Sequence, residues 1–353
     1  MNDRAVNLLD QYDIEVLRTR KGRGAFLCDT SVGCLILKEY RGNEEKLPVQ
    51  DSLLRHLLKA KDIRAEQLIP NREGGLSVKD HDGTVYILKT YEEGRECNIN
   101  DRKECLDAVR LLARLHAHLE FAADVPATAQ DATGANTPAT RDMAAADALL
   151  TAYPLFSPAK EYEKRNRELR RVRKYLKNRS QKTWFEIYLQ QHFDFFMEQA
   201  FALTDEWREY ERLRGQDVQS GQTITYCHGD YQYHNILKTE DGWFLVNFEK
   251  CVQDDPVRDL YLLMRKLLEK SNWSVSLGRE LLAAYEETRT LSALSRIDLY
   301  YRLAYPEKFW KVVNFYDNSG KAWIPGRNLE KLEKVVEQEE SRQSFLDALF
   351  RTV

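Results

Sequence analysis

The stretch "CHGDYQYHNILKTEDGWFLVNFEK", residues 227–250, places polar side chains at fixed intervals around a turn. A carboxylate, Asp230, is followed five residues later by an amide, Asn235. The segment "ILKTEDGWFLV" then has strand-forming residues on both sides of an Asp-Gly pair, which predicts a β-hairpin. The hairpin leads to Asn247 and, two residues later, Glu249. The spacing of Asp230, Asn235 and Asn247 is specific as a set, whereas each residue alone would be a weak signal.

These residue types suit phosphoryl transfer, in which the protein mainly positions charges. The reaction needs an acid that accepts a hydroxyl proton, hard oxygen ligands for Mg²⁺ and a lysine on the phosphates. Asp230 fits the first role, and Asn235 can offer its side-chain oxygen to a metal. Residues 247 and 249 would point to the same side of a strand. Glu249 is then either a metal-binding acid beside Asn247 or a solvated charge at a strand end, and the sequence leaves both interpretations open.

The first 90 residues have the pattern of a small sheet-rich domain. Residues 23–40 predict two short strands around the turn "DTSVG", and residues 74–91 predict a second hairpin with Asp82-Gly83 at its turn. A helix is expected between them, at residues 49–61. This helix places four leucines on one face: Leu53, Leu54, Leu57 and Leu58.

From residue 101 the hydrophobic period becomes helical. We therefore predict an α+β fold with two lobes: a small antiparallel-sheet lobe at residues 1–91 and a larger, mostly helical lobe at residues 92–353. Residues 121–140, rich in Ala, Thr and Pro, are expected to form a mobile surface loop. In such a layout the cleft between the lobes is the default ligand site.

The composition is that of an ordinary soluble globular protein, with 43% hydrophobic and 31% charged residues and a net charge of -3. This balance gives no indication of nucleic-acid binding. The six cysteines form no Cys-x-x-Cys pair, so free thiols are the simplest interpretation. The first residues, "MNDRAVNLLDQYDIEV", lack the basic start and apolar run of a signal peptide, and no stretch approaches the roughly 20 apolar residues of a membrane span. We expect cytoplasmic synthesis and no membrane span.

Several basic, histidine and aromatic residues allow both structural and functional interpretations. Residues 160–182 hold eleven Lys or Arg and three Glu, and they form either a solvated helix face or a surface for an anionic partner. Residues 184–203 predict a buried, aromatic-rich helix. His228 and His234 beside the Asp230 loop are expected to make structural hydrogen bonds. The following aromatic residues are expected to serve packing more than ligand stacking: Phe309, Trp310, Phe315, Tyr316 and Trp323.

The motifs resemble a known group of enzymes. "HGDYQYHNIL" with "VNFEKCVQDDPVRDLYLLMRK" is similar to the aminoglycoside phosphotransferase and choline kinase group of protein-kinase-like folds. Within this group the chain resembles the spore-coat protein CotS family. "YPEKFWKVVNFYDNSGKAW", residues 305–323, is similar to the C-terminal signature of that family, and so are "YEEGRECN" and "LLARLHAHL" at residues 91–98 and 111–119.

The resemblance implies roles for individual residues in the binding of ATP and Mg. Asp230 matches the catalytic base, Asn235 the first metal ligand and Lys38 the phosphate-binding lysine. Asp259 matches a structural aspartate, which we expect to cap the helix "LYLLMRKLLEK". The implied nucleotide contacts come from a glycine loop and a hinge that connects the lobes: Gly22, Gly24, Thr90, Tyr91 and Glu92.

Three departures from the family pattern bear on activity. Asn247 replaces the metal-binding aspartate, a loss that could cost on the order of 3 kcal/mol of transition-state stabilisation, or about a hundredfold in rate. Glu249 stands where the family often has an aspartate, so an acid is retained one methylene longer. The helix after Lys38 has no glutamate to pair with that lysine, and Asp51 is short and early in the helix. Without a partner, Lys38 would be an ordinary exposed strand residue.

The resemblance thus leads to two main hypotheses. In the first, the chain is a spore-coat protein with a degenerate metal site and weak or absent phosphotransferase activity, whose partners are other spore-coat proteins. In the second, it is an active ATP- and Mg-dependent kinase of a small hydroxylated molecule or a coat component. A third hypothesis, a sugar-binding module, predicts ligand binding without dependence on nucleotide.

Overall fold

The structure is a computed structural model that describes residues 3–22, 24–120, 158–214, 225–319 and 325–351. The expected loop at residues 121–140 lies outside these residues. The chain forms two compact units. The first comprises residues 1–155, 223–263 and 284–290, and the second comprises residues 156–222, 264–283 and 291–353. The expected lobe boundary at residue 91 falls inside the first unit, and this boundary stays a prediction.

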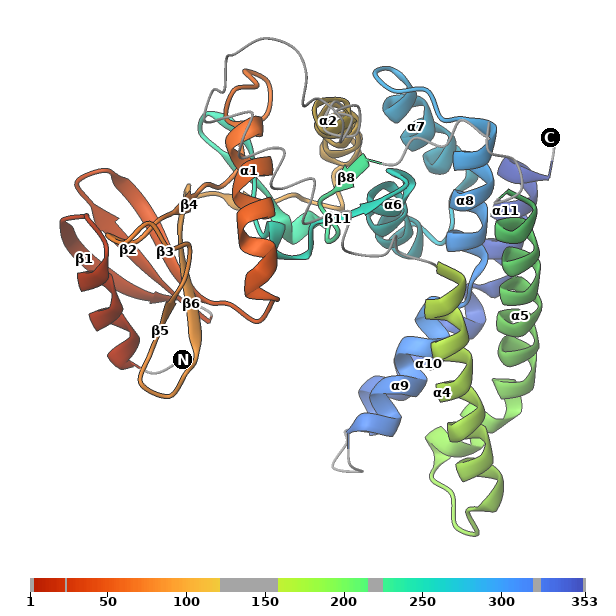
Figure 1. Ribbon diagram of the computed structural model, residues 1–353. Coiled ribbons are helices and arrows are strands. Elements are labelled where there is room, and N and C mark those ends of the chain that lie inside the picture. Colours follow the sequence, from red (N-terminus) through yellow and green to blue (C-terminus); the bar gives the residue numbers. More distant parts are fainter. Residues whose placement is uncertain (1–2, 23, 121–157, 215–224, 320–324, 352–353) are drawn as a thin grey trace. The chain divides into compact units, whose positions relative to one another are not determined.

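A six-stranded antiparallel sheet occupies the N-terminal part of the first unit (Figure 1). Its order is β1-β2-β3-β6-β4, and β5 also pairs with β6. The strands are β1 (Val16–Gly22), β2 (Ala25–Thr30), β3 (Gly33–Glu39), β4 (Leu68–Ile69), β5 (Val78–Lys79) and β6 (Val85–Thr90). Both predicted hairpins are confirmed, and Gly83 adopts the positive φ of 79° that its turn requires. Strand β1 was not predicted, because its mostly exposed side chains lack a hydrophobic pattern.

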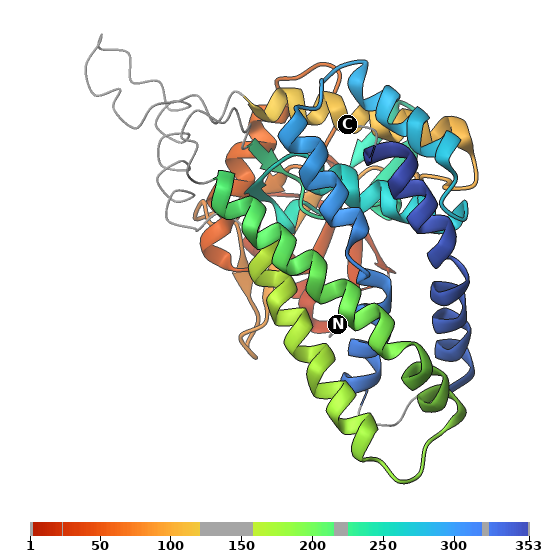
Figure 2. The ribbon, with the colours of Figure 1, turned by 90° about the vertical axis from the view of Figure 1, so that its right-hand side faces the viewer.

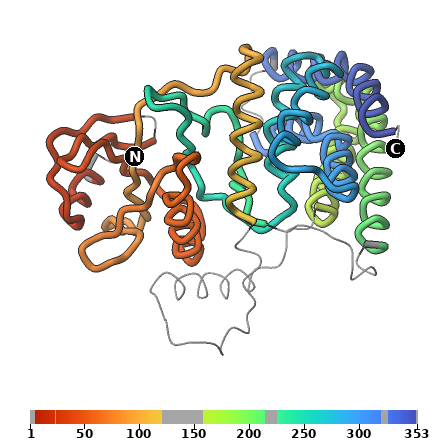
Figure 3. Tube along the Cα trace, turned by 90° about the horizontal axis from the view of Figure 1, so that it is seen from above, coloured from red at the N-terminus to blue at the C-terminus, as the bar shows by residue number. Residues whose placement is uncertain are grey.

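The two faces of this sheet have different roles. On one face, side chains of β2, β3, β5 and β6 pack against the 3₁₀ helix η1 (Asp3–Gln11) in an apolar core. Leu37 of β3 pairs with Leu88 of β6 on that face, and Ile36 pairs with Lys89 one position along. Because side chains alternate along a strand, Lys38 and Lys89 both point to the opposite face. Helix α1 lies on that opposite side of the sheet (Figures 1 and 3).

Helix α1 (Leu47–Leu57) is the helix that the leucine pattern predicted. Leu53, Leu54 and Leu57 are buried, as expected for its inner face. Leu58, which we expected on the same face, is the C-cap residue of the helix and is 67% exposed. That part of the prediction was wrong.

The rest of the first unit surrounds the motif hairpin. Helix α2 (Arg102–Glu120) packs against the short strand β8. The predicted hairpin at residues 236–246 is confirmed as β9 and β10, which join β7 in a three-stranded sheet, while β8 pairs with β11. The bounds are β7 (Arg95–Glu96), β8 (Thr225–Cys227), β9 (Ile236–Thr239), β10 (Gly242–Leu245), β11 (Val252–Asp254) and α6 (Val257–Lys270), of which α6 continues into the second unit.

The second unit is helical. Its helices include α4 (Pro158–Asn178), α5 (Trp184–Arg214), α7 (Val275–Glu286), α8 (Ala293–Ala304), α9 (Glu307–Asn318), α10 (Pro325–Glu337) and α11 (Glu339–Phe350). The long helices α4 and α5 lie side by side (Figure 2) and bury an aromatic core with α9. Phe309 and Tyr316 belong to this core as expected, but Phe315 is 54% exposed, so its predicted packing role was wrong. Trp323 lies outside the described residues. None of the described helices is long and apolar enough to cross a membrane.

Candidate phosphotransfer site

All the candidate site residues belong to the first compact unit. The loop that presents Asp230 turns at Gly229, whose φ is 78°. A Cβ atom at this position would overlap the carbonyl oxygen of Lys250. Asp259 fixes the same loop, because its carboxylate accepts hydrogen bonds from the backbone N–H groups of His228 (2.6 Å) and Gly229 (2.9 Å).

Asp259 therefore has a different role from the helix cap that we expected. Helix α6 begins at Val257, so Asp259 lies within its first turn. The N–H of Val257 donates instead to the side chain of Asp255, at 3.0 Å. His228 has the structural role expected for it: its Nε2 donates to the carbonyl of Val246 (3.0 Å) and its Nδ1 accepts the N–H of Asp230 (3.2 Å).

The candidate base, Asp230, is held by two neighbours. Its Oδ1 accepts from Gln232 Nε2 at 2.6 Å, and its Oδ2 pairs with Lys250 Nζ at 2.9 Å. Burial by itself would raise the pKa of Asp230, but Lys250 and Gln232 outweigh it and the pKa is lowered. The carboxylate is ionised at neutral pH. A lowered pKa also makes it a weaker proton acceptor.

The two asparagines bond to each other through their side-chain amides. Asn235 Nδ2 donates to the carbonyl of Asp230 (2.8 Å), and Asn235 Oδ1 accepts from Asn247 Nδ2 (2.8 Å). Asn247 has a left-handed backbone (φ 69°) and precedes the 3₁₀ turn η5 (Phe248–Lys250). Our expectation that residues 247 and 249 lie on a strand was therefore wrong. Their side chains nevertheless approach the same group, the Lys38 ammonium.

Lys38 bridges the sheet and this turn. Its Nζ lies 2.8 Å from Asn247 Oδ1 and 3.0 Å from Glu249 Oε1. Helix α1 contains no glutamate that could pair with Lys38. Asp51, the acid considered in its place, pairs with Arg55 at 2.7 Å. The partners of Lys38 come from positions 247 and 249, more than 200 residues away in the chain.

Two further residues take part in this network: Glu66 was missed in the sequence, and Lys89 was expected only as the first residue of the hinge segment at residues 89–94. Lys89 Nζ, with a side chain 2% exposed, contacts Glu66 Oε2 (2.8 Å), Glu249 Oε1 (2.9 Å) and Asn247 Oδ1 (3.4 Å). Glu66 also accepts the N–H groups of Asn247 (2.8 Å) and Phe248 (3.0 Å). It thereby holds the backbone at Asn247 as well as the ammonium of Lys89.

The charges of this network stabilise one another. Burial would lower the pKa of Lys89, but Glu66 and Glu249 outweigh it and raise the pKa. Burial would raise the pKa of Glu249, but Lys89 and Lys38 outweigh it and lower the pKa to about 2. One signal in the sequence was available: Lys89 is an isolated charge in the apolar strand "VYILKT", and a lysine buried in a strand needs an acidic partner.

The implied nucleotide contacts occupy two local structures. Gly22 ends β1, and Gly24 (φ 72°) precedes β2, so the two glycines lie where β1 turns into β2. Thr90 exchanges hydrogen bonds with Gln67, at 2.8 and 2.9 Å. Tyr91 packs against an apolar cluster of the β9–β10 hairpin and Val246, and Glu92 pairs with Arg64 at 2.6 Å. The nucleotide contacts of these residues stay a prediction.

A buried cluster of His116, Cys227 and Asp259 has potential metal ligands within 4.8 Å of one another. His116 Nδ1 lies 2.8 Å from the Tyr285 hydroxyl, and its Nε2 lies 3.3 Å from Asp259 Oδ2. Asp259 is also engaged by the Asp230 loop. Hydrogen bonds within the protein therefore account for this cluster.

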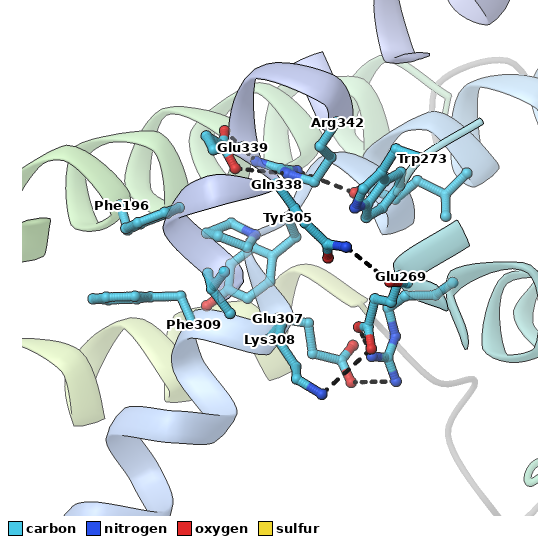
Figure 4. A pocket seen from close by; sticks show the side chains of 14 residues that line it. Phe196, Glu269, Trp273, Tyr305, Glu307, Lys308, Phe309, Gln338, Glu339 and Arg342 are labelled. Atoms are coloured by element: carbon cyan, nitrogen blue, oxygen red, sulfur yellow. Dashed lines mark hydrogen bonds and ion pairs between the residues drawn. The ribbon is translucent and has the colours of Figure 1, made fainter. Parts of the chain in front are cut away.

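A separate pocket lies within the second unit (Figure 4). Its charged groups pair with one another: Glu269 with Arg265 (2.5 Å) and Lys308 (3.3 Å), and Glu339 with Arg342 (2.8 Å). Its lining includes no residue of the predicted site. We therefore place the candidate chemistry at the hydrogen-bonded group that joins Asp230 to Lys38, which we call the Asp230–Lys38 centre. It also includes Asn235, Asn247, Glu249, Lys89 and Glu66.

Solved structures of phosphotransferases share this architecture. The aminoglycoside phosphotransferase from Alicyclobacillus acidocaldarius subsp. acidocaldarius DSM 446 has a TM-score of 0.73 and 17% identity, with 98% of this chain and 94% of that chain covered. Spectinomycin phosphotransferase, crystallised with ADP and spectinomycin, has a TM-score of 0.64 and 14% identity, with 99% of both chains covered. The predicted α+β kinase-like fold is confirmed.

The sequence profile of the phosphotransferase enzyme family matches residues 21–300, so the chain belongs to this family. A second comparison is more specific. Over 143 residues the chain is 29% identical to spore coat protein S of Bacillus subtilis (strain 168). This match spans 40% of each protein. The resemblance to the spore-coat protein family, stated above from motifs, is confirmed.

Proposed function

We propose that this protein is a spore-coat protein whose kinase-like centre has a degenerate metal site and weak or absent phosphotransferase activity. The observation that supports this most is the bonding of Asn247 and Glu249 to Lys38 and Lys89. The oxygens expected to bind a metal instead accept hydrogen bonds from ammonium groups. The similarity to spore coat protein S supports the location in the coat. Other coat proteins are the partners that we propose.

The centre retains the groups that would bind a nucleotide. The side chain of Lys38 is 32% exposed, which lets its ammonium reach a phosphate group. The hinge at residues 90–92 would contact the base. A protein of the same fold, spectinomycin phosphotransferase, was crystallised with AMP and with ADP, which supports ATP as the ligand of this centre. ATP would supply the phosphoryl group, and the side chains of the centre would pair with the charges of its phosphates.

An active ATP- and Mg-dependent kinase of a small hydroxylated acceptor is the second candidate. It is favoured by Asp230, which is ionised, and by Asn235, whose side chain holds the Asp230 loop through a bond of 2.8 Å. In this case Asn247→Asp should raise phosphotransfer by about a hundredfold, since the restored carboxylate would stabilise charge in the transition state.

The test combines an activity assay with localisation. We expect ATP turnover near background for the native protein with Mg²⁺, and we expect the protein in the coat fraction of spores. Substantial turnover that disappears in Asp230→Ala would overturn the proposal in favour of an active kinase. Turnover that survives Asp230→Ala would show that another residue is the base. Absence from the coat fraction would overturn the location.

A further inference from the structure

Each of the three side chains expected to bind a divalent metal has an oxygen atom that is engaged within the protein. Glu249 Oε1 lies 3.0 Å from Lys38 Nζ and 2.9 Å from Lys89 Nζ. Asn247 Oδ1 lies 2.8 and 3.4 Å from the same two nitrogens. Asn235 Oδ1 accepts the Asn247 amide at 2.8 Å. A metal ion bound to these oxygens would lie next to two ammonium groups.

The charges of this group are balanced without an ion. Lys38 and Lys89 contribute two positive charges, and Glu66 and Glu249 contribute two negative ones. Mg²⁺ prefers hard, charged oxygens in octahedral geometry. The two amides and one shared carboxylate of this centre do not fit that requirement, because Asn247 Oδ1 and Glu249 Oε1 bond to ammonium groups and Asn235 Oδ1 bonds to an amide.

Lys89 is unable to withdraw from the centre. It lies in the interior of β6, its side chain is 2% exposed, and the register with β3 directs it to the face of Lys38. Moving its ammonium away would leave the buried Glu66 without its cationic partner and Glu249 with Lys38 alone, which is costly. The Lys89 ammonium is thus a permanent cation of the centre.

We propose that the centre binds the phosphate groups of a nucleotide without a divalent metal, with Lys89 as the resident cation and Lys38 as the group that contacts phosphate. This inference rests on the proposed nucleotide-binding centre. Lys38 can turn from Glu249 to a phosphate because Glu249 keeps its contact with Lys89. An Mg²⁺-bound nucleotide carries less negative charge, and its metal would be repelled by the two ammonium groups.

The first experiment is isothermal titration calorimetry of the full chain with ADP, either in EDTA or with excess Mg²⁺. We expect binding in EDTA that is equal to or tighter than binding with Mg²⁺. Lys38→Met should weaken binding in EDTA by about tenfold or more, since a charge-assisted contact to phosphate is lost. Lys79→Met is the matched control: this β5 lysine pairs with Glu44 at 2.9 Å on the surface and should leave the affinity unchanged.

A second variant tests the role of Lys89 directly. The double change Asn247→Asp with Lys89→Met replaces the resident cation by a cluster of acids that suits a divalent ion. We expect Mg²⁺ alone to raise the melting temperature of this variant and to leave that of the native protein unchanged. Should the variant fail to fold even with Mg²⁺, the calorimetry of the native protein still decides the question.

Each outcome has one meaning. ADP binding that requires Mg²⁺ in the native protein would overturn the inference, and so would no ADP binding in either buffer. An Mg²⁺-induced rise in the native melting temperature would also count against it. These results leave the coat location and the weak activity intact, because those are measured by spore fractionation and product formation. Conversely, rapid turnover in the activity assay would overturn the proposed function without deciding whether ADP binds free of metal.

Discussion

Lys89 in the first unit and Lys174 in the second are both lysines inside regular secondary structure, in strand β6 and helix α4, and their surroundings are opposite. Lys89 is buried and contacts two acids and an amide. Lys174 is exposed, and no other described residue forms an ion pair with it. The Lys89 ammonium has defined partners and a fixed position, whereas the Lys174 ammonium on the helix surface is solvated. The comparison separates a buried lysine, whose position depends on its acidic partners, from an exposed lysine that water solvates.

The basic stretch contains both situations. Five of its basic residues recur every three or four positions along α4 and are exposed: Lys160, Lys164, Arg167, Arg171 and Lys174. Arg165, on the other side of the helix, is buried and pairs with Glu307 at 3.3 Å. The exposure agrees with a solvated face, and a surface for an anionic partner stays a prediction.

The largest effect should come from breaking the buried network. Glu66→Ala would leave Lys89 with Glu249 as its single acidic partner, and two backbone N–H groups would lose their acceptor. We expect a loss of about 3–5 kcal/mol in the free energy of unfolding, measured by urea denaturation. The control is Glu44→Ala, which removes a surface partner of Lys79 and should cost about 1 kcal/mol or less. Equal losses in the two variants would contradict the distinction.

A pH series tests the buried acid of the second unit. Burial would raise the pKa of Glu307, but Arg265, Arg165 and Lys311 outweigh it and hold the pKa well below the ordinary 4.5. The folded protein thus releases this proton more readily than the unfolded chain does. Its contribution to stability is complete above pH 4.5 and is lost as the pH falls toward the lower folded pKa.

Glu307→Gln should therefore destabilise the protein by roughly 3 kcal/mol near pH 7, because an acid is removed from buried cations. The difference from the native protein should shrink below pH 4.5, because Glu307 of the unfolded chain takes up a proton there that the folded protein has to release. Urea denaturation of both proteins at pH 3.5, 5 and 7 provides the measurement. A difference that stays constant over this range would show that Glu307 is not the titrating group.

Two glycines with the same backbone conformation allow a smaller effect to be isolated. Gly229 at the centre has φ 78°, and Gly83 in a surface turn has φ 79°. An added Cβ would overlap the Lys250 carbonyl at Gly229 but would meet nothing within 4 Å at Gly83. We expect Gly83→Ala to cost about 1 kcal/mol from the left-handed backbone alone, and Gly229→Ala to cost at least about 2 kcal/mol. Thermal denaturation of the two variants measures the difference, and similar losses would show that the loop relaxes freely.

Features that depend on neighbouring residues could be predicted from the sequence, whereas features that depend on distant residues could not. The hairpins at β2–β3 and β9–β10 follow from turn residues and strand formers within a few positions of each other. The Asp230–Asn235 spacing is equally local. The partner of Lys38 was not predictable from local patterns, because it depends on how the sheet and the η5 turn approach each other in three dimensions.

Individual conformations were missed for similar reasons. Asn247 adopts a left-handed backbone, which asparagine does more readily than most residues. Glu66 accepts its N–H and that of Phe248 from a distant part of the chain, and no local pattern indicates these bonds. Lys89 was detectable in principle as a charge inside an apolar strand, although its acids at positions 66 and 249 were not.

The smallest effect is expected on the exposed face of α4. Lys174→Ala removes a side chain that has no ion-pair partner among the described residues, so the free energy of unfolding should change by less than about 0.5 kcal/mol. Arg165→Ala, on the buried side of the same helix, should cost several times more because Glu307 loses a partner. Urea denaturation of the two variants in the same buffer provides the measurement. A large loss in Lys174→Ala would show that the basic stretch is held by tertiary contacts along its whole length, and the contrast between buried and exposed charges would fail at this helix.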